Sequence, residues 1–198
     1  MNLYAVYRHL CRWYTRYAGR SFHRFGLGSL IHPPLNVNNP DGIAVGAHVV
    51  IGSFSWIGVN ADPLGSSPHL VIEDGCSIGA HAFIHAKRKV HLQRNVILAP
   101  RVYIADHHYD YRDPGRPIMH QAPAEGRDVV IEEDCFLGIG ACIMKGVVVG
   151  KHSVVGANAV VTGNVPPYSI VVGNPGRVVR RFDPATANWE KVGGLEER

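Results

Sequence analysis

The chain has 198 residues, of which 46% are hydrophobic and 18% are charged, enough apolar content for one domain with a continuous core. No apolar run approaches the roughly 18 residues of a membrane span, and the first residues lack the apolar segment and cleavage site of a secretory signal, so we expect a cytoplasmic protein. The net charge of +4 is uneven, because the first 24 residues contain five arginines and no acidic residue. A single row of arginines without a recognised module does not predict nucleic-acid binding.

An amphipathic helix is predicted over residues 3–18. Aromatic and aliphatic side chains recur there at helical spacing, with arginines every fourth residue along the other side. Two roles are open: the aromatic face covers the open end or flank of the domain that follows, or the helix lies on anionic lipid at the inner face of a membrane. Residues 26–42 are rich in Gly, Pro and Asn and predict a linker, and we assign residues 1–30 to helix and linker.

A six-residue repeat dominates the rest of the chain, which we assign to one domain over residues 31–176. Fifteen aliphatic residues fall into five groups of three with a spacing of six: Val45, Ile51 and Ile57; Ile72, Ile78 and Ile84; Val90, Val96 and Val102; Ile131, Leu137 and Ile143; Val149, Val155 and Val161. A period of six fits neither a helix nor a lone strand, whereas three short sides joined by corners give a coil of about 18 residues with its aliphatics inside. The pattern predicts an all-β solenoid, a left-handed parallel β-helix of about five coils.

Two interruptions break the count of six. The first, over residues 62–68, predicts an enlarged corner. The second predicts a loop over residues 106–128 that is extruded from the solenoid, and it carries His107, His108, Tyr109, Tyr111 and Arg112. A loop of this length in a compact domain is usually functional or disordered, and its composition favours function.

The end of the chain predicts a stop and a helix. Two prolines at 166–167 end the repeat, a short extended segment over residues 169–172 follows, and then comes the run Gly-Asn-Pro-Gly-Arg at 173–177. Asp183 followed by Pro184 is a typical helix start, so we expect a short C-terminal helix within the tail 177–198.

The four cysteines indicate neither a disulfide nor a zinc site. No Cys-x-x-Cys pair is present, and Cys76 and Cys135 stand at the small-residue position of the repeat. We expect buried thiols in a reducing compartment.

Several segments resemble one family. The stretches 104–109, 113–118, 131–138 and 171–177 resemble the hexapeptide-repeat acyltransferases, and within them the sugar and polysaccharide O-acetyltransferases that include the maltose and galactoside acetyltransferases. The resemblance covers about residues 30–180 and implies transfer of an acetyl group from acetyl-CoA to a sugar hydroxyl, plausibly in an exopolysaccharide or lipopolysaccharide unit, without a metal.

The resemblance implies a general base at His107. An imidazole can take the proton of an acceptor hydroxyl near neutral pH while that hydroxyl attacks the thioester directly. His108 is the rival, since neighbours in an extended segment point to opposite sides. Asp106, Asp110 or a backbone carbonyl would orient the base.

Further site residues follow from the same resemblance. Acceptor contacts are implied for His85, His108, Tyr109, Tyr111 and Arg112. Cofactor contacts are implied for Gly138, Ile139, Ala157, Thr162, Gly163, Arg177 and Arg180. Gly163 stands where some relatives have a lysine, and Phe136 replaces a frequent tryptophan. The resemblance also implies a homotrimer in which donor and base meet between subunits.

Three other functions compete with this hypothesis. An N-acetyltransferase would share the fold and act on an amino-sugar nucleotide or a drug amine. A metal enzyme like the γ-class carbonic anhydrases would use three of the twelve histidines, although the loop and the ending do not resemble that group. A noncatalytic scaffold would keep the repeat and lose the transfer.

Overall fold

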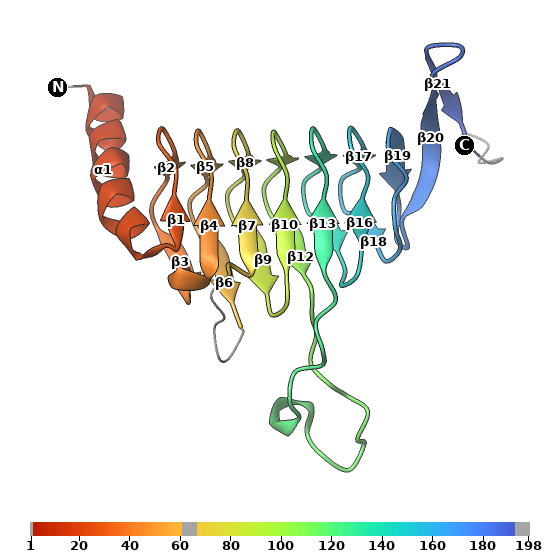
Figure 1. The fold of residues 1–198 in the computed structure, drawn as a ribbon, viewed down its shortest axis with the longest axis horizontal. Coiled ribbons are helices and arrows are strands. Elements are labelled where there is room, and N and C mark those ends of the chain that lie inside the picture. Colours follow the sequence, from red (N-terminus) through yellow and green to blue (C-terminus); the bar gives the residue numbers. More distant parts are fainter. Residues whose placement is uncertain (1, 61–66, 193–198) are drawn as a thin grey trace.

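The chain winds as a triangular prism whose three faces are parallel β-sheets (Figure 1). The structure is a computed structural model and describes residues 2–60 and 67–192. The predicted left-handed parallel β-helix is confirmed. Most of the predicted enlarged corner, residues 62–66, lies outside the described residues.

Each sheet takes one strand from every coil. Sheet A contains β1 (Arg24–Phe25), β4 (Ile43–Val45), β7 (Leu70–Ile72), β10 (Val90–Leu92), β13 (Val129–Ile131) and β16 (Val148–Val149). Sheet B contains β2 (Leu30–Ile31), β5 (Val50–Ile51), β8 (Ser77–Ile78), β11 (Ile97–Leu98), β14 (Phe136–Leu137), β17 (Val154–Val155) and β19 (Ser169–Val172). Sheet C contains β3 (Leu35–Asn38), β6 (Ser55–Val59), β9 (Phe83–Ala86), β12 (Tyr103–Ala105), β15 (Cys142–Ile143) and β18 (Val160–Val161).

The core is a stack of aliphatic side chains along the prism axis. In sheet B, Ile51 pairs with Ile78 and Ile78 pairs with Leu98, and each of the three side chains is at most 2% exposed. Burial of one such side chain contributes about 1.5–3 kcal/mol. The stack therefore gives a rigid surface on which outward-facing residues are held.

The described residues form six coils, so the prediction of five was wrong. β1, β2 and β3 build a first coil over residues 24–38, where we expected a linker and a domain start at 31. Phe25, Ile31 and Val37 stand six apart and align with Val45, Ile51 and Ile57 of the next coil. The glycines and prolines that suggested a linker occupy the corners of this coil.

The predicted register of the coil that contains β10, β11 and β12 was also wrong. Leu92, not Val90, aligns with Ile72, and Ile104, not Val102, aligns with Ile84. Positions two residues before the aligned aliphatics are buried as well, so the valines at 90, 96 and 102 mimic the repeat. The true count from Ile84 to the next aligned aliphatic is eight rather than six.

α1 (Leu3–Ala18) covers the N-terminal end of the prism, as in the first of its two predicted roles (Figure 1). The aromatic face was expected to make this contact, but Trp13 and Tyr17 are exposed. Cys11 is 1% exposed, and the Thr15 hydroxyl accepts a hydrogen bond from the Ile31 N–H over 2.8 Å. The outer stripe of α1 is exposed and apolar: Leu3, Leu10, Trp13 and Tyr17. Contact of this stripe with a membrane stays a prediction. No helix among the described residues is long and apolar enough to cross a bilayer. A 3-10 turn, η1 (Gly19–Ser21), leads into β1.

The predicted C-terminal helix is absent, and a hairpin stands in its place. β20 (Arg177–Asp183) pairs antiparallel with β19 and with β21 (Asn188–Lys191). Asp183 does not cap a helix: its Oδ1 accepts the Ala185 N–H over 2.9 Å and closes a tight turn. Phe182 and Trp189 then pack across the hairpin with ring centroids 5.7 Å apart.

Candidate functional site

The candidate site lies where the long loop leaves sheet C. The loop 106–128 extends away from the prism between β12 and β13 and carries the short turn η3 (Ile118–His120) (Figure 1). Its two arms are joined by backbone hydrogen bonds from Arg127 N to Asp106 O and from Ala124 N to His108 O. The Lys87 ammonium ties the returning arm to the preceding coil through the carbonyls of Pro123 and Ala124. The first residues of the loop are therefore fixed.

Asp106 is fully buried and holds the ring of His107. Its carboxylate accepts backbone N–H groups of residues 87, 88 and 89 over 2.6–2.8 Å and lies 2.8 Å from His107 Nδ1. Burial alone raises the pKa of this carboxyl, but the hydrogen bonds from His107 and the three amides together outweigh it, so the pKa lies below its ordinary value. An ionised carboxylate can only accept, hence Nδ1 of His107 carries the proton and Nε2 keeps its lone pair.

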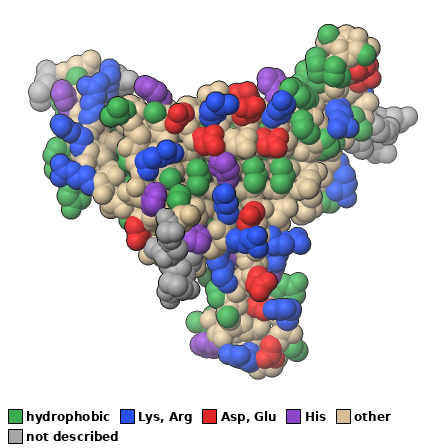
Figure 2. Space-filling model, viewed as in Figure 1, with side chains coloured by type: hydrophobic (Ala, Val, Ile, Leu, Met, Phe, Trp, Pro, Cys, Tyr) green, Lys and Arg blue, Asp and Glu red, His purple; other side chains and the backbone are tan. Residues whose placement is uncertain are grey.

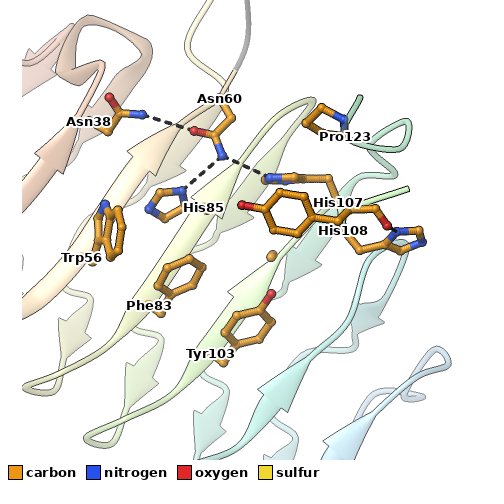
Figure 3. A pocket seen from close by; sticks show the side chains of 11 residues that line it. Asn38, Trp56, Asn60, Phe83, His85, Tyr103, His107, His108 and Pro123 are labelled. Carbon is orange, nitrogen blue, oxygen red and sulfur yellow. Dashed lines mark hydrogen bonds between the residues drawn. The ribbon is translucent and has the colours of Figure 1, made fainter. Parts of the chain in front are cut away.

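Asn60 links this histidine to a second one. The amide nitrogen of Asn60 lies 3.1 Å from His107 Nε2 and 3.4 Å from His85 Nδ1, and its amide oxygen accepts from Asn38 over 3.2 Å (Figure 3). These four side chains come from the carboxyl ends of the stacked strands β3, β6, β9 and β12 or just beyond them. The parallel register therefore brings four sequence-distant polar groups to one corner.

His85 is held as a neutral ring. It is 4% exposed and stacks on Phe83 with centroids 4.4 Å apart. Burial, together with the nearby imidazole of His107, lowers the pKa of His85 to about 4. With Nδ1 accepting from Asn60, the proton sits on Nε2, which is buried and has no hydrogen-bond partner within the described part of the chain.

These groups border a pocket of about 370 Å³. Its floor is aromatic, and polar side chains and the loop stem form its rim (Figure 3). The lining residues are Asn38, Trp56, Asn60, Phe83, His85, Tyr103, Ala105, His107, His108, Tyr109 and Pro123. A mostly apolar cavity with a few convergent polar groups is typical of a small-molecule site.

The structure divides the predicted acceptor residues between two places. His85, His108 and Tyr109 line the His107 pocket. Tyr111 and Arg112 instead line a second cavity, of about 680 Å³, further out on the loop. Asp110 pairs with the Arg112 guanidinium there, and this pairing holds the pKa of Asp110 well below its usual range. Asp106, not Asp110, therefore orients His107.

None of the seven predicted cofactor residues lines the His107 pocket of the single chain. Gly138, Ile139 and Ala157 lie at stacked turns between sheets B and C, where a Cβ on Gly138 would come within 2.7 Å of the Ala157 nitrogen. Thr162 and Gly163 follow β18, and Arg177 and Arg180 lie in β20. Their contact with a cofactor stays a prediction.

Seven pocket residues were not predicted from the sequence: Asn38, Trp56, Asn60, Phe83, Tyr103, Ala105 and Pro123. Trp56, Phe83 and Tyr103 each stand directly before an inward aliphatic, so a signal existed for them. The wrong register of the coil that contains β12 hid it, because Tyr103 then followed the supposed inward residue. Asn38 belongs to the coil that was taken for a linker.

Two buried thiols lie apart from this pocket. Cys76 and Cys135 are buried as expected, and burial raises the pKa of each thiol to about 11. Among the described residues no group of three or more His, Cys, Asp or Glu side chains is arranged to hold a metal ion.

Comparisons with known proteins agree with the fold and the repeat. A family model described as "Bacterial transferase hexapeptide (six repeats)" matches residues 128–163. The putative lipopolysaccharide biosynthesis O-acetyl transferase WbbJ of Escherichia coli K12 is 25% identical over 169 residues, 82% of this chain and 84% of its own length. Further curated acetyltransferases match over less than two thirds of their own length.

Solved structures are similar along most of the chain. The hexapeptide-repeat acetyltransferase VCA0836 of Vibrio cholerae has a TM-score of 0.56 and 26% identity, covering 86% of this chain and 81% of its own. AntD, an N-acyltransferase of Bacillus cereus, has a TM-score of 0.73 at 19% identity, with 87% and 91% covered, and shows the fold alone. The prism has the fold of hexapeptide-repeat transferases, and the Asp106–His107 pair borders its pocket. The chain is similar to the hexapeptide-repeat acyltransferases in its repeat and along most of its fold.

Proposed function

We propose that this chain is an acetyl-CoA-dependent O-acetyltransferase that acetylates a sugar hydroxyl, with His107 as the general base. The observation that carries the proposal is the Asp106–His107 pair, in which Nε2 of His107 accepts from the Asn60 amide and borders a pocket for a small molecule. Two relatives support it: WbbJ is named as an O-acetyl transferase of lipopolysaccharide biosynthesis, and VCA0836 has been solved with acetyl-CoA.

The chemistry follows from the direction of the hydrogen bonds. The acceptor hydroxyl donates to Nε2 of His107, in the place where the Asn60 amide lies in the free chain. As its oxygen attacks the thioester carbonyl carbon, the proton passes to Nε2 and the C–O bond forms. The C–S bond then breaks, and the imidazolium returns the proton to the leaving thiolate. The Asp106 carboxylate stabilises the imidazolium, and base catalysis of this kind typically contributes about 10² to 10⁴ in rate.

A homotrimer is part of the proposal. His107 lies at the corner that ends sheet C, whereas Gly138, Ile139 and Ala157 lie at the corner before it. A neighbour related by a closed three-fold axis can bring its own turn corner to the His107 corner. Exposed Ile118 and Met119 on the extruded loop also fit a contact with a neighbour.

The donor contacts of the seven predicted residues are proposed on the same basis. Arg177 and Arg180 would hold phosphate groups of the donor, since a guanidinium is a fixed two-pronged donor. The cytoplasmic location and the membrane contact of α1 stay predictions beside this proposal.

An amine acceptor is the second candidate, because the fold is also that of the N-acyltransferase AntD. A neutral amine attacks the thioester in the same way as a hydroxyl and loses its proton to the same base.

Acceptor screening tests the proposal. The purified chain is incubated with acetyl-CoA and matched panels of sugars and amines, and release of free thiol and product mass are measured. We expect acetyl transfer to hydroxyls without an acyl-enzyme intermediate. Transfer only to amines would replace the acceptor class. Donor binding without any transfer would favour a scaffold, and activity that depends on stoichiometric zinc would favour a metal enzyme.

A further inference from the structure

Three aromatic side chains form a column on the outer face of sheet C, next to the base. Trp56, Phe83 and Tyr103 come from the neighbouring strands β6, β9 and β12 and are paired by register. Ring centroids are 5.6 Å apart for Trp56 and Phe83, and 5.1 Å apart for Phe83 and Tyr103, the latter two nearly parallel. Each precedes a buried isoleucine, so the column faces outward along its whole length.

The column is open to a ligand. Trp56 is 48% exposed, and all three rings line the pocket of His107 (Figure 3). Contiguous exposed aromatic surface beside polar groups marks binding sites rather than ordinary protein surface.

A second row of residues on the same face shapes the floor. Asn38, Gly58, His85 and Ala105 are paired by register beside the aromatic column. A Cβ on Gly58 would lie 3.0 Å from both Asn38 Cβ and His85 Cε1. A glycine at position 58 leaves room for the side chains of Asn38 and His85 to lie close together above it. The Asn38 amide therefore reaches the rim of the pocket.

The pocket is uncharged. Of the described residues that line it, none is Lys, Arg, Asp or Glu. Burial and the neighbouring His107 lower the pKa of His85 to about 4, so that ring is neutral near pH 7. The groups that can hydrogen-bond a ligand are amides, imidazoles and the hydroxyl groups of tyrosines. A charged ligand would lose hydration here without gaining a partner of opposite charge.

We propose that the pocket binds an uncharged pyranose ring, with one apolar face of the ring against Phe83 and Tyr103 and the reacting hydroxyl at Nε2 of His107. This inference rests on the proposed function and narrows its acceptor class. Aromatic rings supply apolar contact for ring C–H groups, and the amides of Asn38 and Asn60 supply hydrogen bonds for ring hydroxyls. Trp56 extends the column away from His107 and gives room for a second sugar ring.

A series of acceptors tests whether the pocket prefers an uncharged sugar. Initial rates of acetyl transfer are compared for neutral methyl hexopyranosides, for the matching methyl hexuronides, and for nucleoside diphosphate hexoses. We expect kcat/KM for the best neutral acceptor to exceed that of its hexuronide at least tenfold. Preference for the hexuronide or for the diphosphate-linked sugar would overturn the inference, and the second outcome would place the phosphates in the outer cavity with Arg112, Arg127 and Lys145.

Variants test the aromatic column. Phe83→Leu and Tyr103→Leu should each raise the acceptor KM about tenfold, leave kcat within threefold, and leave the KM for acetyl-CoA unchanged. Tyr103→Phe keeps the ring and should therefore raise the acceptor KM less than Tyr103→Leu does. Phe54→Leu is the matched control, because Phe54 is an exposed aromatic that stacks on His81 outside the pocket. Unchanged acceptor KM in both leucine variants would overturn the inference.

A binding experiment separates this inference from the proposed function. Saturation-transfer NMR detects methyl pyranosides on the wild-type chain and on Phe83→Leu without any catalysis, and circular dichroism checks that the variant is folded. If the chain transfers no acetyl group to any hydroxyl, the proposed function fails. Saturation transfer to the sugar-ring protons on the wild type that is lost in Phe83→Leu would still support binding of an uncharged pyranose in the pocket. The absence of a signal for every neutral pyranoside would refute it.

Discussion

The buried carboxylate of Asp106 connects folding and chemistry in a single side chain. It satisfies three backbone N–H groups at the corner before β10 and also fixes the proton on Nδ1 of His107. In Asp106→Asn the amide has only one acceptor oxygen for the three backbone N–H groups and for Nδ1 of His107. The side chain then no longer fixes the proton of His107 on Nδ1. We expect kcat to fall about 10²-fold or more and the free energy of unfolding to fall by about 2–4 kcal/mol, measured by steady-state kinetics and urea titration.

Asp110→Asn is the matched control for that substitution. Asp110 pairs with the exposed Arg112 on the loop and does not touch His107. Exposed ion pairs contribute little to stability, so both kcat and the urea midpoint should stay near wild type. Equal losses in the two variants would show that Asp106 has no special role.

His85 makes stability depend on pH. Its folded pKa of about 4 lies below the ordinary value of about 6.5. As the pH falls through this window, the unfolded chain takes up a proton at His85 that the folded chain refuses, and the free energy of unfolding falls by at most about 3 kcal/mol. His107 faces residue 85 in both wild type and His85→Phe, so comparing how their unfolding free energies change between pH 7.5 and pH 4.5 isolates His85. Parallel curves for the two chains would contradict the assignment.

The site was only partly predictable at this scale. His107 could be predicted because a histidine pair in an extruded loop and a family resemblance both pointed to it, whereas His85 followed from the resemblance alone. Asn60 and Asn38 carry no local signal, since an asparagine after a strand is an ordinary turn residue. They become site residues only through the stacking of coils that lie 22 and 25 residues apart in sequence.

Among the elements, the N-terminal helix and most strands of the solenoid were predictable, and the first coil and the C-terminal hairpin were not. The inward-facing residue of each six-residue repeat is buried in the core of the prism, so an aliphatic residue recurs there reliably. The position two before it is also buried, which is why Val90 and Leu92 are equally good candidates from sequence alone. The C-terminal hairpin was missed because Asp183 closes a turn with the same chemistry that starts a helix.

α1 gives the element-scale prediction. Its Thr15 hydroxyl satisfies the N–H of Ile31 on the first coil, which has no coil beneath it. Thr15→Val keeps the shape and leaves that buried donor unpaired, so the free energy of unfolding should fall by about 1–3 kcal/mol. Thr162→Val, at an exposed position, is the control and should change the urea midpoint little. Equal stability of both variants would mean that α1 does not cap the prism through this bond.

At the scale of the whole molecule, the proposed trimer places each site between two chains. His107→Ala and Ala157→Glu chains should each be inactive, the second because a charge enters the proposed donor groove. When equal amounts of the two chains assemble at random, about three quarters of the trimers contain both variants. One of the three sites in each such trimer carries neither substitution, so about a quarter of wild-type activity should return. The measurement is thiol release after joint refolding.

A control pair distinguishes complementation from simple stabilisation. His107→Ala and Asp106→Asn both damage the half of the site that supplies the base. A mixture of these two chains therefore contains no intact site and should restore no activity. No recovery in the first mixture would place donor and base within one chain.

The central claim is that the Nε2 atom of His107 removes the proton of the acceptor hydroxyl. The most direct measurement is kcat of His107→Ala at saturating acetyl-CoA and acceptor, beside the affinity of the same chain for CoA by calorimetry. We expect kcat to fall by about 10² to 10⁴ while CoA affinity and the circular dichroism spectrum stay at wild-type values. A folded variant that binds CoA and turns over within threefold of wild type would contradict it.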